Sequence, residues 1–505
     1  MIGKRQPASI GALTLALLST LLLLVARPAQ AQTETQLWDF CPDGGTCADG
    51  SQSYSSLATD GTNFYGTTFD GGLSFGTVFE VSPNSIGGWN ENVIYTFTGG
   101  TDGAHPRSSP LIFDSLGNLY GTAQYGGPNQ YGVVFELSPQ GANWTETVLY
   151  SFAGGTDGYS PVSGLIMDPS GNLYGTTLFG GVSQNGTVFE LSLSGGAWSK
   201  QTIYEPSTGT GYAGLTMDAK GSVYGATPLA VFELSPNGDG GFNSTVIHTF
   251  TGTPKDGMQA EGTPVLQGGK LYGTTEFGGV ENLGTVYELS PVKNGKWTEK
   301  ILHSFKGGVK DGDECYAGIV FDPAGNIYGT TISGGKFGVG GDGIVFELVA
   351  PVGTGSYKEK ILWNFNGTDG TAPFGGLILD SAGNLYGTTQ VGGTYGDGTV
   401  FEVAPSGTAA TTTTTLTSSL NPSTPGEAVT FTAAVTPTPF DGETITFKHG
   451  STVLGTGLLS GGSASYTTST LPVGTTSVEA VYGGDGDFDA STSNVVKQVV
   501  DKAAD

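Results

Sequence analysis

The sequence has few charged residues, and most of its charge is of one sign. Charged residues make up 13% of the 505 positions, and 45 Asp and Glu oppose 19 Lys and Arg, for a formal net charge of −26. An acidic chain repels nucleic acid and anionic membranes, so neither is an expected partner. The charge favours solubility and attracts cations, but by itself it identifies no ligand.

Long hydrophobic runs are missing beyond the first 31 residues. Lys4 and Arg5 precede an uncharged apolar run at 10–25, which is short for a membrane span, and Ala29-Gln30-Ala31 offers a small-x-small cleavage site. We predict a signal peptide over 1–31 and no transmembrane anchor in the mature chain. The expected location is extracellular or on the cell surface, with the periplasm as an alternative; a retained N-terminal anchor is the other interpretation.

Cysteine is rare, and motifs of known catalytic sites are missing. Cys41 and Cys47 lie in one predicted loop, where export would allow a local disulfide, whereas Cys315 has no cysteine neighbour and is expected to be a buried thiol. The sequence has no zinc-protease motif, nucleophile elbow, phosphate-binding loop or Cys-x-x-Cys pair, and we expect no cofactor.

Glycine, in contrast, is abundant, and it recurs within a repeat. The chain has 86 glycines, and the abundance of Gly, Thr, Ser, Val and aromatic residues favours short strands over long helices. The motif Tyr-Gly-Thr/Ala-Thr/Ala recurs at intervals of 48 to 58 residues, the length of a four-stranded propeller blade. Its seven tyrosines are Tyr65, Tyr120, Tyr174, Tyr224, Tyr272, Tyr328 and Tyr386.

Each repeat predicts four strands. Residues 164–168 indicate the first strand, 172–177 the second and 186–192 the third, and 148–152 of the preceding repeat show the fourth most clearly. Asp-x-x-Gly-Asn turns separate the first strand from the second, and Gly-Gly loops separate the second from the third.

The ends of the array predict a closed ring. The seventh repeat stops after its third strand at 399–403, while residues 33–40 match the fourth strand of repeat five, 298–305, in register. The N-terminal strand therefore supplies the strand that the last blade lacks and leaves no open sheet edge. We predict a seven-bladed β-propeller closed by an N-terminal strand; an open solenoid is the alternative.

After the array the composition changes. A threonine-rich linker is expected over 408–415, and 416–500 contains about seven short runs of alternating apolar and polar residues, typical of an Ig-like β-sandwich. The predicted organisation is all-β: a signal peptide over 1–31, a propeller over 32–407, the linker, the Ig-like domain and a tail at 501–505.

Both parts resemble known bacterial families. Through N-L-Y-G-T-T, G-T-V-F-E-L-S and V-L-Y-S-F, the repeat resembles the GloVer tandem repeat of exported proteins, over about three quarters of the chain. The tail resembles bacterial Ig-like repeat domains at 429–433, 445–447 and 480–485. The resemblance implies a surface or secreted protein and supplies no catalytic residues. Family members end in varied anchors, but we identify no sorting motif here and expect free secretion or non-covalent attachment.

Two classes of loop are expected on one face of the ring, because strands within a blade run antiparallel. Gly-Gly marks the loops between second and third strands, and Asp-Gly marks the loops between blades. The latter predict a ligand-binding face that attracts Ca²⁺ or a cationic or hydroxyl-rich ligand. Its aspartates are Asp49, Asp102, Asp157, Asp256, Asp311 and Asp369. The alternative is turn chemistry. Asp311 and Asp313 are the densest metal candidates, without the spacing of a full calcium loop.

Other recurrent residues indicate packing. A glutamate in the third strand of every repeat predicts a clamp between blades, and His248 and His303 share the strand position of Tyr95. Packing is also expected of the tryptophans, with sugar stacking as the alternative: Trp89, Trp144, Trp198 and Trp297. Repeat four lacks both loop motifs, which predicts a notch in the loop face, either a binding cleft or drift of one repeat.

These observations favour a protein that binds or scaffolds an extracellular glycan or protein, with the Ig-like domain as spacer or second adhesive unit. The alternatives are a carbohydrate-active enzyme, a hydrolase or lyase that uses carboxylates of the propeller, and a structural surface-layer component. Inward-facing carboxylates about 5–9 Å apart would favour the enzyme. Exposed aromatic residues near the notch would favour sugar binding.

Overall fold

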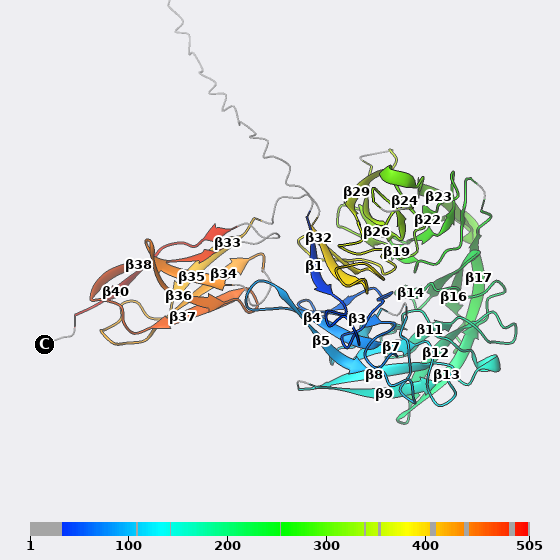
Figure 1. Ribbon diagram of the computed structural model, residues 1–505, viewed down its shortest axis with the longest axis horizontal. Coiled ribbons are helices and arrows are strands. Elements are labelled where there is room, and N and C mark those ends of the chain that lie inside the picture. The colour runs from blue at the N-terminus through cyan, green and yellow to red at the C-terminus, as the bar shows by residue number, and fades with distance from the viewer. Residues whose placement is uncertain are drawn as a thin grey trace, which may run out of the picture.

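Seven four-stranded antiparallel sheets surround a central axis, and the chain then continues into a β-sandwich (Figure 1). The computed structural model describes residues 33–107, 110–141, 143–252, 254–337, 340–351, 355–404, 411–438, 444–483 and 490–502. The predicted signal peptide lies outside these residues, as do the first part of the predicted linker and the end of the tail. Within the described ranges, no helix has the length and apolar character that crossing a membrane requires.

Each sheet is one blade, and its strands pair in chain order. The first four blades are β2 (Ala58–Thr59), β3 (Phe64–Thr68), β4 (Thr77–Pro83) and β5 (Trp89–Thr96); β6 (Ile112–Phe113), β7 (Leu119–Ala123), β8 (Val133–Gln140) and β9 (Asn143–Ser151); β10 (Ile166–Met167), β11 (Leu173–Thr177), β12 (Thr187–Ser194) and β13 (Ala197–Tyr204); β14 (Leu215–Met217), β15 (Val223–Thr227), β16 (Ala230–Pro236) and β17 (Phe242–Thr249).

The last three blades complete the ring. They are β19 (Val265–Gln267), β20 (Lys270–Thr275), β22 (Thr285–Pro291) and β23 (Trp297–Ser304); β25 (Val320–Phe321), β26 (Ile327–Thr331), β28 (Ile344–Val349) and β29 (Lys358–Asn364); and β30 (Ile378–Leu379), β31 (Leu385–Thr388), β32 (Thr399–Ala404) and β1 (Thr33–Asp39). Short 3₁₀ turns lie at η1 (Gly155–Asp157), η2 (Lys293–Gly295) and η3 (Gly308–Lys310).

The N-terminal strand closes the ring, as predicted. β1 pairs antiparallel with β32, from Thr33 opposite Ala404 to Asp39 opposite Thr399. A register shift interrupts the pairing of third and fourth strands in every blade, and β1 carries it too, between Gln36 and Trp38. The β-bulge increases the local twist of the fourth strand, which is the outermost strand of its blade. β1 therefore replaces a fourth strand in pairing and in shape.

The glycine of Tyr-Gly-Thr allows one aromatic ring to lie across each blade. In the third blade, a Cβ on Gly175 would lie 2.7 Å from Cζ of Phe189, the residue opposite it on β12. The six equivalent glycines make the same approach, at 2.4 to 2.7 Å, to a Phe or Tyr of the third strand. The two sequence motifs are thus linked by sterics, because any side chain at this glycine would displace a buried ring.

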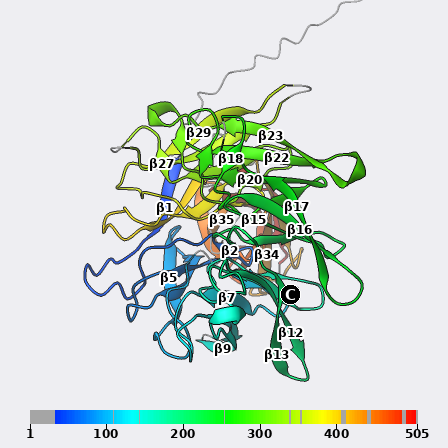
Figure 2. The ribbon, with the colours of Figure 1, turned by 90° about the vertical axis from the view of Figure 1, so that its right-hand side faces the viewer.

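The loops of one face pair with each other at six of the seven junctions between blades. β18 (Gly257–Met258) pairs with β21 (Phe277–Gly278), and β24 (Gly312–Asp313) pairs with β27 (Ser333–Gly334). Single bridges make the same connection elsewhere: Ser51 with Asp70, Ala104 with Tyr125, Tyr159 with Phe179, and Thr371 with Val391. The Asp-Gly and Gly-Gly loops therefore share one end of the ring, called here the loop face (Figure 2).

The C-terminal domain is a sandwich of two antiparallel sheets. One contains β33 (Thr413–Ser418), β34 (Val429–Thr436) and β37 (Ser463–Thr468); the other contains β35 (Thr444–His449), β36 (Thr452–Leu458), β38 (Gly474–Tyr482), β39 (Ser491–Thr492) and β40 (Val496–Val500). Alternate residues of β34 are buried, and Phe431, Ile445 and Phe447 lie in a core without cysteine. This confirms the predicted all-β fold with an Ig-like domain.

We expect the substitution Phe40→Ala to destabilise the propeller by about 3–5 kcal/mol. Phe40 follows β1, is fully buried, and packs against Phe79 of the first blade at a centroid distance of 5.2 Å, so its loss loosens the contact that closes the ring. Urea denaturation measures the change, with Phe179→Ala, at a 44% exposed ring, as the control. Equal stability of Phe40→Ala and wild type would contradict closure by β1.

Candidate functional site

Each of the six loop aspartates accepts a hydrogen bond from a side chain of the fourth strand that precedes it in the chain or, for Asp49, from β1. Asp102 accepts hydrogen bonds from the Tyr95 hydroxyl at 3.0 Å and from the Thr98 N–H at 2.8 Å. The other five contact an aromatic or histidine side chain at the same position: Trp38, Tyr150, His248, His303 and Trp363. The predicted packing role of the two histidines therefore includes this polar contact.

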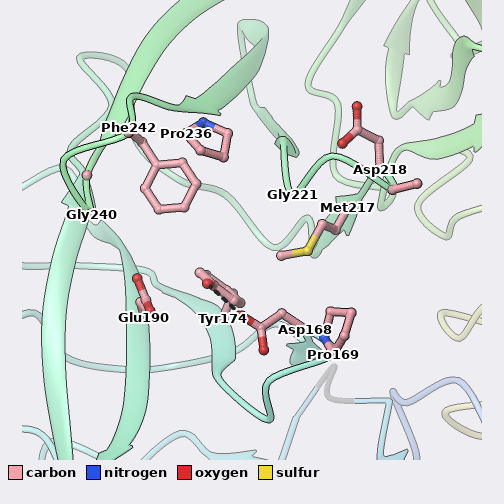
Figure 3. A pocket seen from close by; sticks show the side chains of 13 residues that line it. Asp168, Pro169, Tyr174, Glu190, Met217, Asp218, Gly221, Pro236, Gly240 and Phe242 are labelled. Carbon is pink, nitrogen blue, oxygen red and sulfur yellow. Dashed lines mark hydrogen bonds between the residues drawn. The ribbon is translucent and has the colours of Figure 1, made fainter.

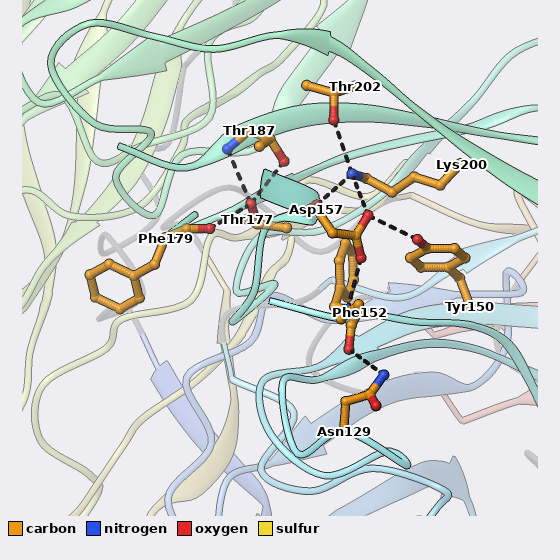
Figure 4. A network of polar contacts seen from close by, with 10 residues as sticks. Asn129, Tyr150, Phe152, Asp157, Thr177, Phe179, Thr187, Lys200 and Thr202 are labelled. Carbon is orange, nitrogen blue, oxygen red and sulfur yellow. Dashed lines mark hydrogen bonds and ion pairs between the residues drawn. The ribbon is translucent and has the colours of Figure 1, made fainter. Parts of the chain in front are cut away.

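These contacts give the aspartates a structural role in the loops. Asp102, Asp256, Asp311 and Asp369 are buried, and the adjoining glycines are tightly packed. A Cβ on Gly158, for example, would lie 2.5 Å from the Thr177 hydroxyl oxygen, which itself contacts Thr187 (Figure 4). Turn chemistry accounts for the Asp-Gly pattern, and a ligand-binding role for its aspartates stays a prediction.

A second carboxyl group, from the next blade, lies beside five of these aspartates. Burial and then the charge of the neighbouring aspartate raise the pKa of Glu34, Glu91 and Glu299 to about 8 and that of Glu146 to about 7. Burial likewise raises the pKa of Glu359 to about 9. The pairs are Asp369–Glu34, Asp49–Glu91, Asp102–Glu146, Asp256–Glu299 and Asp311–Glu359. Near neutral pH the pairs with a glutamate pKa of about 8 or 9 therefore mostly retain a proton, and the Asp102–Glu146 pair retains one about half of the time.

The junction between the second and third blades has a lysine in place of the glutamate. The Lys200 side chain is 3% exposed, and its Nζ lies 3.0 Å from an Asp157 carboxylate oxygen; it also donates to the Asp157 carbonyl and to Thr202 (Figure 4). Tyr150 completes the network with a 2.9 Å bond to Asp157. The lysine ammonium thus neutralises the aspartate at this junction, whereas at the five junctions with a carboxyl pair a proton on the glutamate removes the repulsion between the two carboxyl groups.

Two of the junctions have the composition of a metal site. Ligand atoms of His248, Asp256 and Glu299 lie within 4.8 Å of one another, and the corresponding atoms of His303, Asp311 and Glu359 do the same. His, Asp and Glu suit a divalent cation. The Asp–Glu pair also forms at junctions where Trp or Tyr replaces the histidine, so packing alone explains the arrangement. Asp313, the second predicted calcium ligand, is not part of either group.

The carboxyl pairs predict a pH-dependent stability. Between the ordinary pKa of glutamate, 4.5, and the folded values near 7 and 8, the folded state binds more protons than the unfolded chain, so the free energy of unfolding falls as pH rises. We expect the melting temperature to fall by several degrees between pH 5 and about pH 8, and to fall less in Glu91→Gln/Glu146→Gln, since an amide mimics the protonated carboxyl. Calorimetry measures this; Glu281→Gln, at an exposed position, is the control. A melting temperature that rises over this range would contradict the assignment.

The third-strand glutamates bond within their own blades. The hydroxyl groups of Tyr65, Tyr224 and Tyr328 donate to Glu80, Glu233 and Glu347 at 2.8, 3.4 and 3.3 Å. These residues face each other across paired strands of one sheet. The prediction of a clamp between blades is therefore wrong at these positions, because each glutamate carboxylate accepts its hydrogen bond from the tyrosine of the same blade.

Repeat four has the short loop that the sequence predicts. Only two residues separate β15 from β16, and Thr227 lies opposite Ala230. A cavity of about 380 Å³ lies between the third and fourth blades, at the end of the blades opposite to that loop, and is lined by Asp168, Tyr174, Met217 and Phe242 (Figure 3). Phe242 stands opposite Pro236 where Trp89, Trp144 and Trp297 stand in other blades. The cavity is present because the phenyl ring of Phe242 is smaller than the indole ring that those blades place at this position.

We expect Phe242→Trp to fill part of this cavity and to stabilise the protein by about 0.5–2 kcal/mol. Denaturant titration measures the change. The matched control is Trp198→Phe, which opens the same space one junction away and should destabilise the protein. If Phe242→Trp also destabilises it, the cavity is not a packing defect that a Trp can repair.

The axial end of the loop face contains a cluster that the sequence analysis missed. Tyr54, Arg107, Tyr212, Tyr316 and Phe374, called here the axial cluster, precede the first strands of five different blades. Ring centroids lie 5.3 Å apart for Tyr54–Phe374, 5.1 Å for Tyr316–Phe374 and 5.9 Å for Tyr212–Tyr316. The Arg107 guanidinium connects Tyr54 to Tyr212 and completes the ring of contacts.

Three glutamates surround this cluster. Glu261 is buried, lines a small cleft with Tyr54, Tyr212 and Tyr316, and accepts the Tyr212 N–H at 2.8 Å. Burial raises the pKa of Glu261, and burial together with Glu261 and Glu314 raises the pKa of Glu276 to about 7. The cluster thus combines partly exposed aromatic rings, one guanidinium and a carboxyl group that titrates near neutral pH.

A weak signal in the sequence could have revealed the axial cluster. Its members stand eleven to thirteen residues before the tyrosine of Tyr-Gly-Thr, but their identities vary between repeats. A backbone feature is more regular. Two residues earlier, Gln52, His105, Glu314 and Ala372 adopt left-handed φ values of 52 to 58°. Strain of this kind is concentrated at functional sites.

The loop face also carries the exposed aromatic residues of the protein. Among the described residues, every aromatic side chain that ranks as exposed lies in a loop between second and third strands: Tyr125, Tyr131, Phe179, Phe337 and Tyr395. We call them the loop-face aromatics. Phe179 stacks on Tyr159 at 5.3 Å and Tyr159 contacts Tyr131 at 5.4 Å, at the junction between the second and third blades.

A disulfide joins Cys41 to Cys47, and Cys315 is a buried free thiol. The bridge lies between β1 and the first blade, two residues before Asp49, and the Cys41 N–H donates to Asp49 at 3.1 Å. Burial raises the pKa of Cys315, so its thiol stays protonated and unreactive. Neither feature contributes a nucleophile to the loop face.

Fold and site together define a class of protein: a tandem-repeat β-propeller with aromatic loops, followed by an Ig-like domain. The model of the Gloeobacter/Verrucomicrobia repeat matches residues 27–230 and 228–438, and that of the bacterial Ig-like domain (group 3) matches 416–501. The chain belongs to the Gloeobacter/Verrucomicrobia repeat family. No curated protein matches it.

Several solved structures are similar to this chain. The extracellular domain of a hybrid two-component system of B. thetaiotaomicron is 12% identical with a TM-score of 0.50; the match covers 93% of this chain and 59% of that one. A 6-phosphogluconolactonase of Bacteroides uniformis is 12% identical, with a TM-score of 0.43, and covers 66% and 88%. An ulvan lyase is 11% identical, with a TM-score of 0.40, and covers 77% and 90%. At these identities the first similarity concerns the fold and not the activity.

Proposed function

We propose that this is an exported binding protein that holds an extracellular glycan on the loop face of its propeller. One observation carries the proposal: the exposed aromatic residues among the described positions are confined to the loops of that face. Faces of Tyr and Phe rings pack against the apolar faces of sugar rings, and the tyrosine hydroxyl adds a polar contact. The predicted signal peptide supports export.

The position of the aromatic residues supports a glycan over a structural role. The Tyr131–Tyr159–Phe179 group lies on the loop face at the junction between the second and third blades. A purely structural component has no need for partly exposed rings gathered on one face of the ring. The tryptophans, by comparison, pack between blades: Trp144 contacts Tyr65 of the preceding blade at 6.3 Å. They are less suited to stacking on a ligand.

We expect Tyr131→Ala and Phe179→Ala each to weaken glycan binding by about 2- to 10-fold, since an aromatic contact contributes about 0.5–1.5 kcal/mol. Binding is measured by screening immobilised polysaccharides and then by calorimetry on the best ligand. Leu193→Ala is the control, because Leu193 is 56% exposed in the β12–β13 hairpin at the opposite end of the blade. Unchanged affinity in both aromatic variants would contradict the proposal.

A carbohydrate-active enzyme is the second candidate, and Glu276 favours it. Its pKa of about 7 suits a general acid or base, and Gln259 holds its carboxylate at 2.9 Å near the axial cluster. Product analysis on the glycan that binds separates the two candidates. Cleavage that is lost in Glu276→Gln supports an enzyme, whereas binding without cleavage supports the binding protein.

A further inference from the structure

Arg107 is the one arginine of the sequence outside the predicted signal peptide, which contains Arg5 and Arg27. It lies in the axial cluster, on the segment that leads into β6. Elsewhere the chain uses lysine for its positive charge. An arginine differs from a lysine in its planar fork of N–H donors, which matches the oxygens of a carboxylate or a sulfate.

Aromatic rings pack against the flat faces of the Arg107 guanidinium. Its Cζ lies 4.7 Å from the centroid of Tyr54, 5.0 Å from that of Tyr212 and 6.0 Å from that of Phe69. Cation–π contacts of this kind use the flat faces of the guanidinium. Its N–H donors lie in the plane of the group, so the rings fix the orientation of the fork without using the donors.

No acceptor in the described part of the chain pairs with the Arg107 side chain, and its Nε is buried without a partner. The acidic residues around it have other contacts. Asp70 lies 3.3 Å from His105, Glu261 accepts the Tyr212 N–H, and Glu276 accepts a hydrogen bond from Gln259. In a chain with 45 acidic residues, this guanidinium is left without a carboxylate. A partly buried guanidinium whose N–H donors lack acceptors is energetically unfavourable, and a bound anion would supply those acceptors.

We propose that Arg107 is the anion subsite of the loop-face binding site and selects an acidic glycan, one that bears a carboxylate or a sulfate ester. This inference rests on the proposed function. The carboxylate of a uronic acid and a sulfate ester share the chemistry that the fork recognises, two oxygens that accept parallel N–H bonds. The aromatic rings beside it contact the sugar face, and Arg107 contacts its charged substituent.

An aromatic path connects the loop-face aromatics to this subsite. Tyr125, which is 45% exposed, contacts His105 at 5.9 Å; His105 contacts Phe69 at 4.6 Å, and Phe69 contacts Tyr54 at 5.7 Å. Tyr54 is one of the rings under Arg107. A sugar chain on the loop face can therefore contact exposed rings and the guanidinium together. Salt screens the repulsion between this ligand and the acidic chain beyond about 10 Å at 0.1 M ionic strength.

Matched ligand pairs test the subsite on the full mature chain. Calorimetry compares an oligogalacturonate with its carboxyl-reduced neutral form, and a sulfated oligosaccharide with its desulfated form. We expect the preferred acidic ligand to bind wild type at least 10-fold more tightly than its neutral counterpart. Arg107→Gln should remove that preference, so that acidic and neutral forms bind it with equal affinity. Arg107→Lys, which keeps the charge but loses the fork, should lose several-fold in affinity. The control is Lys310→Gln, an exposed cation of η3 on the same face, which should keep the preference.

The outcomes distinguish the two proposals. The pair that shows the preference identifies carboxylate or sulfate as the recognised group. Equal affinity of acidic and neutral forms, unchanged in Arg107→Gln, overturns the anion subsite but leaves glycan binding standing. No binding of any of the four ligands to wild type overturns both. Thermal unfolding checks the fold of each variant; if Arg107→Gln is unfolded, Arg107→Lys decides, and full retention of acidic affinity in it overturns the bidentate contact.

Discussion

The pairing of β1 with β32 is the contact on which the rest of the propeller depends. Seven blades form a ring only if the last sheet has its fourth strand, and that strand comes from the N-terminal end. Phe40 and Leu37 then join the core between the seventh and first blades. Once the ring closes, the segments that precede the first strands meet at the axis, and residues more than 300 positions apart, such as Tyr54 and Phe374, come into contact.

The acidic composition is accommodated at the junctions between blades. Five of them place a buried or half-buried aspartate beside a glutamate with a raised pKa, so a proton takes the place of a counterion, and at a sixth junction Lys200 supplies the positive charge. The loops of one face are thereby held by contacts between neighbouring blades. Their aspartates accept hydrogen bonds from the same loops and strands, whereas the aromatic residues of these loops are exposed and no described residue pairs with the Arg107 side chain.

Much of the fold could be predicted from the sequence because its determinants are local. Tyr-Gly-Thr and Val-Phe-Glu mark paired strands, since the ring of Phe189 needs a glycine opposite it at Gly175. The N-terminal strand was identifiable by its match in register to another outer strand. The site was less accessible. The aspartates recur visibly because they hold every loop, whereas the residues of the axial cluster differ in each repeat, and no period reveals them.

What the sequence determined by itself was the repeat, its number, the strand that closes the ring and the change to an Ig-like domain, because strand pattern and turn chemistry are set by neighbouring residues. The tertiary structure decided which recurrent side chains are occupied and which are free. Asp102 and Arg107 are both polar residues of the loop before one blade, yet the first is saturated by Tyr95 and Thr98 and the second is not. Their difference depends on partners brought in from other strands and blades, which spacing along the chain does not encode.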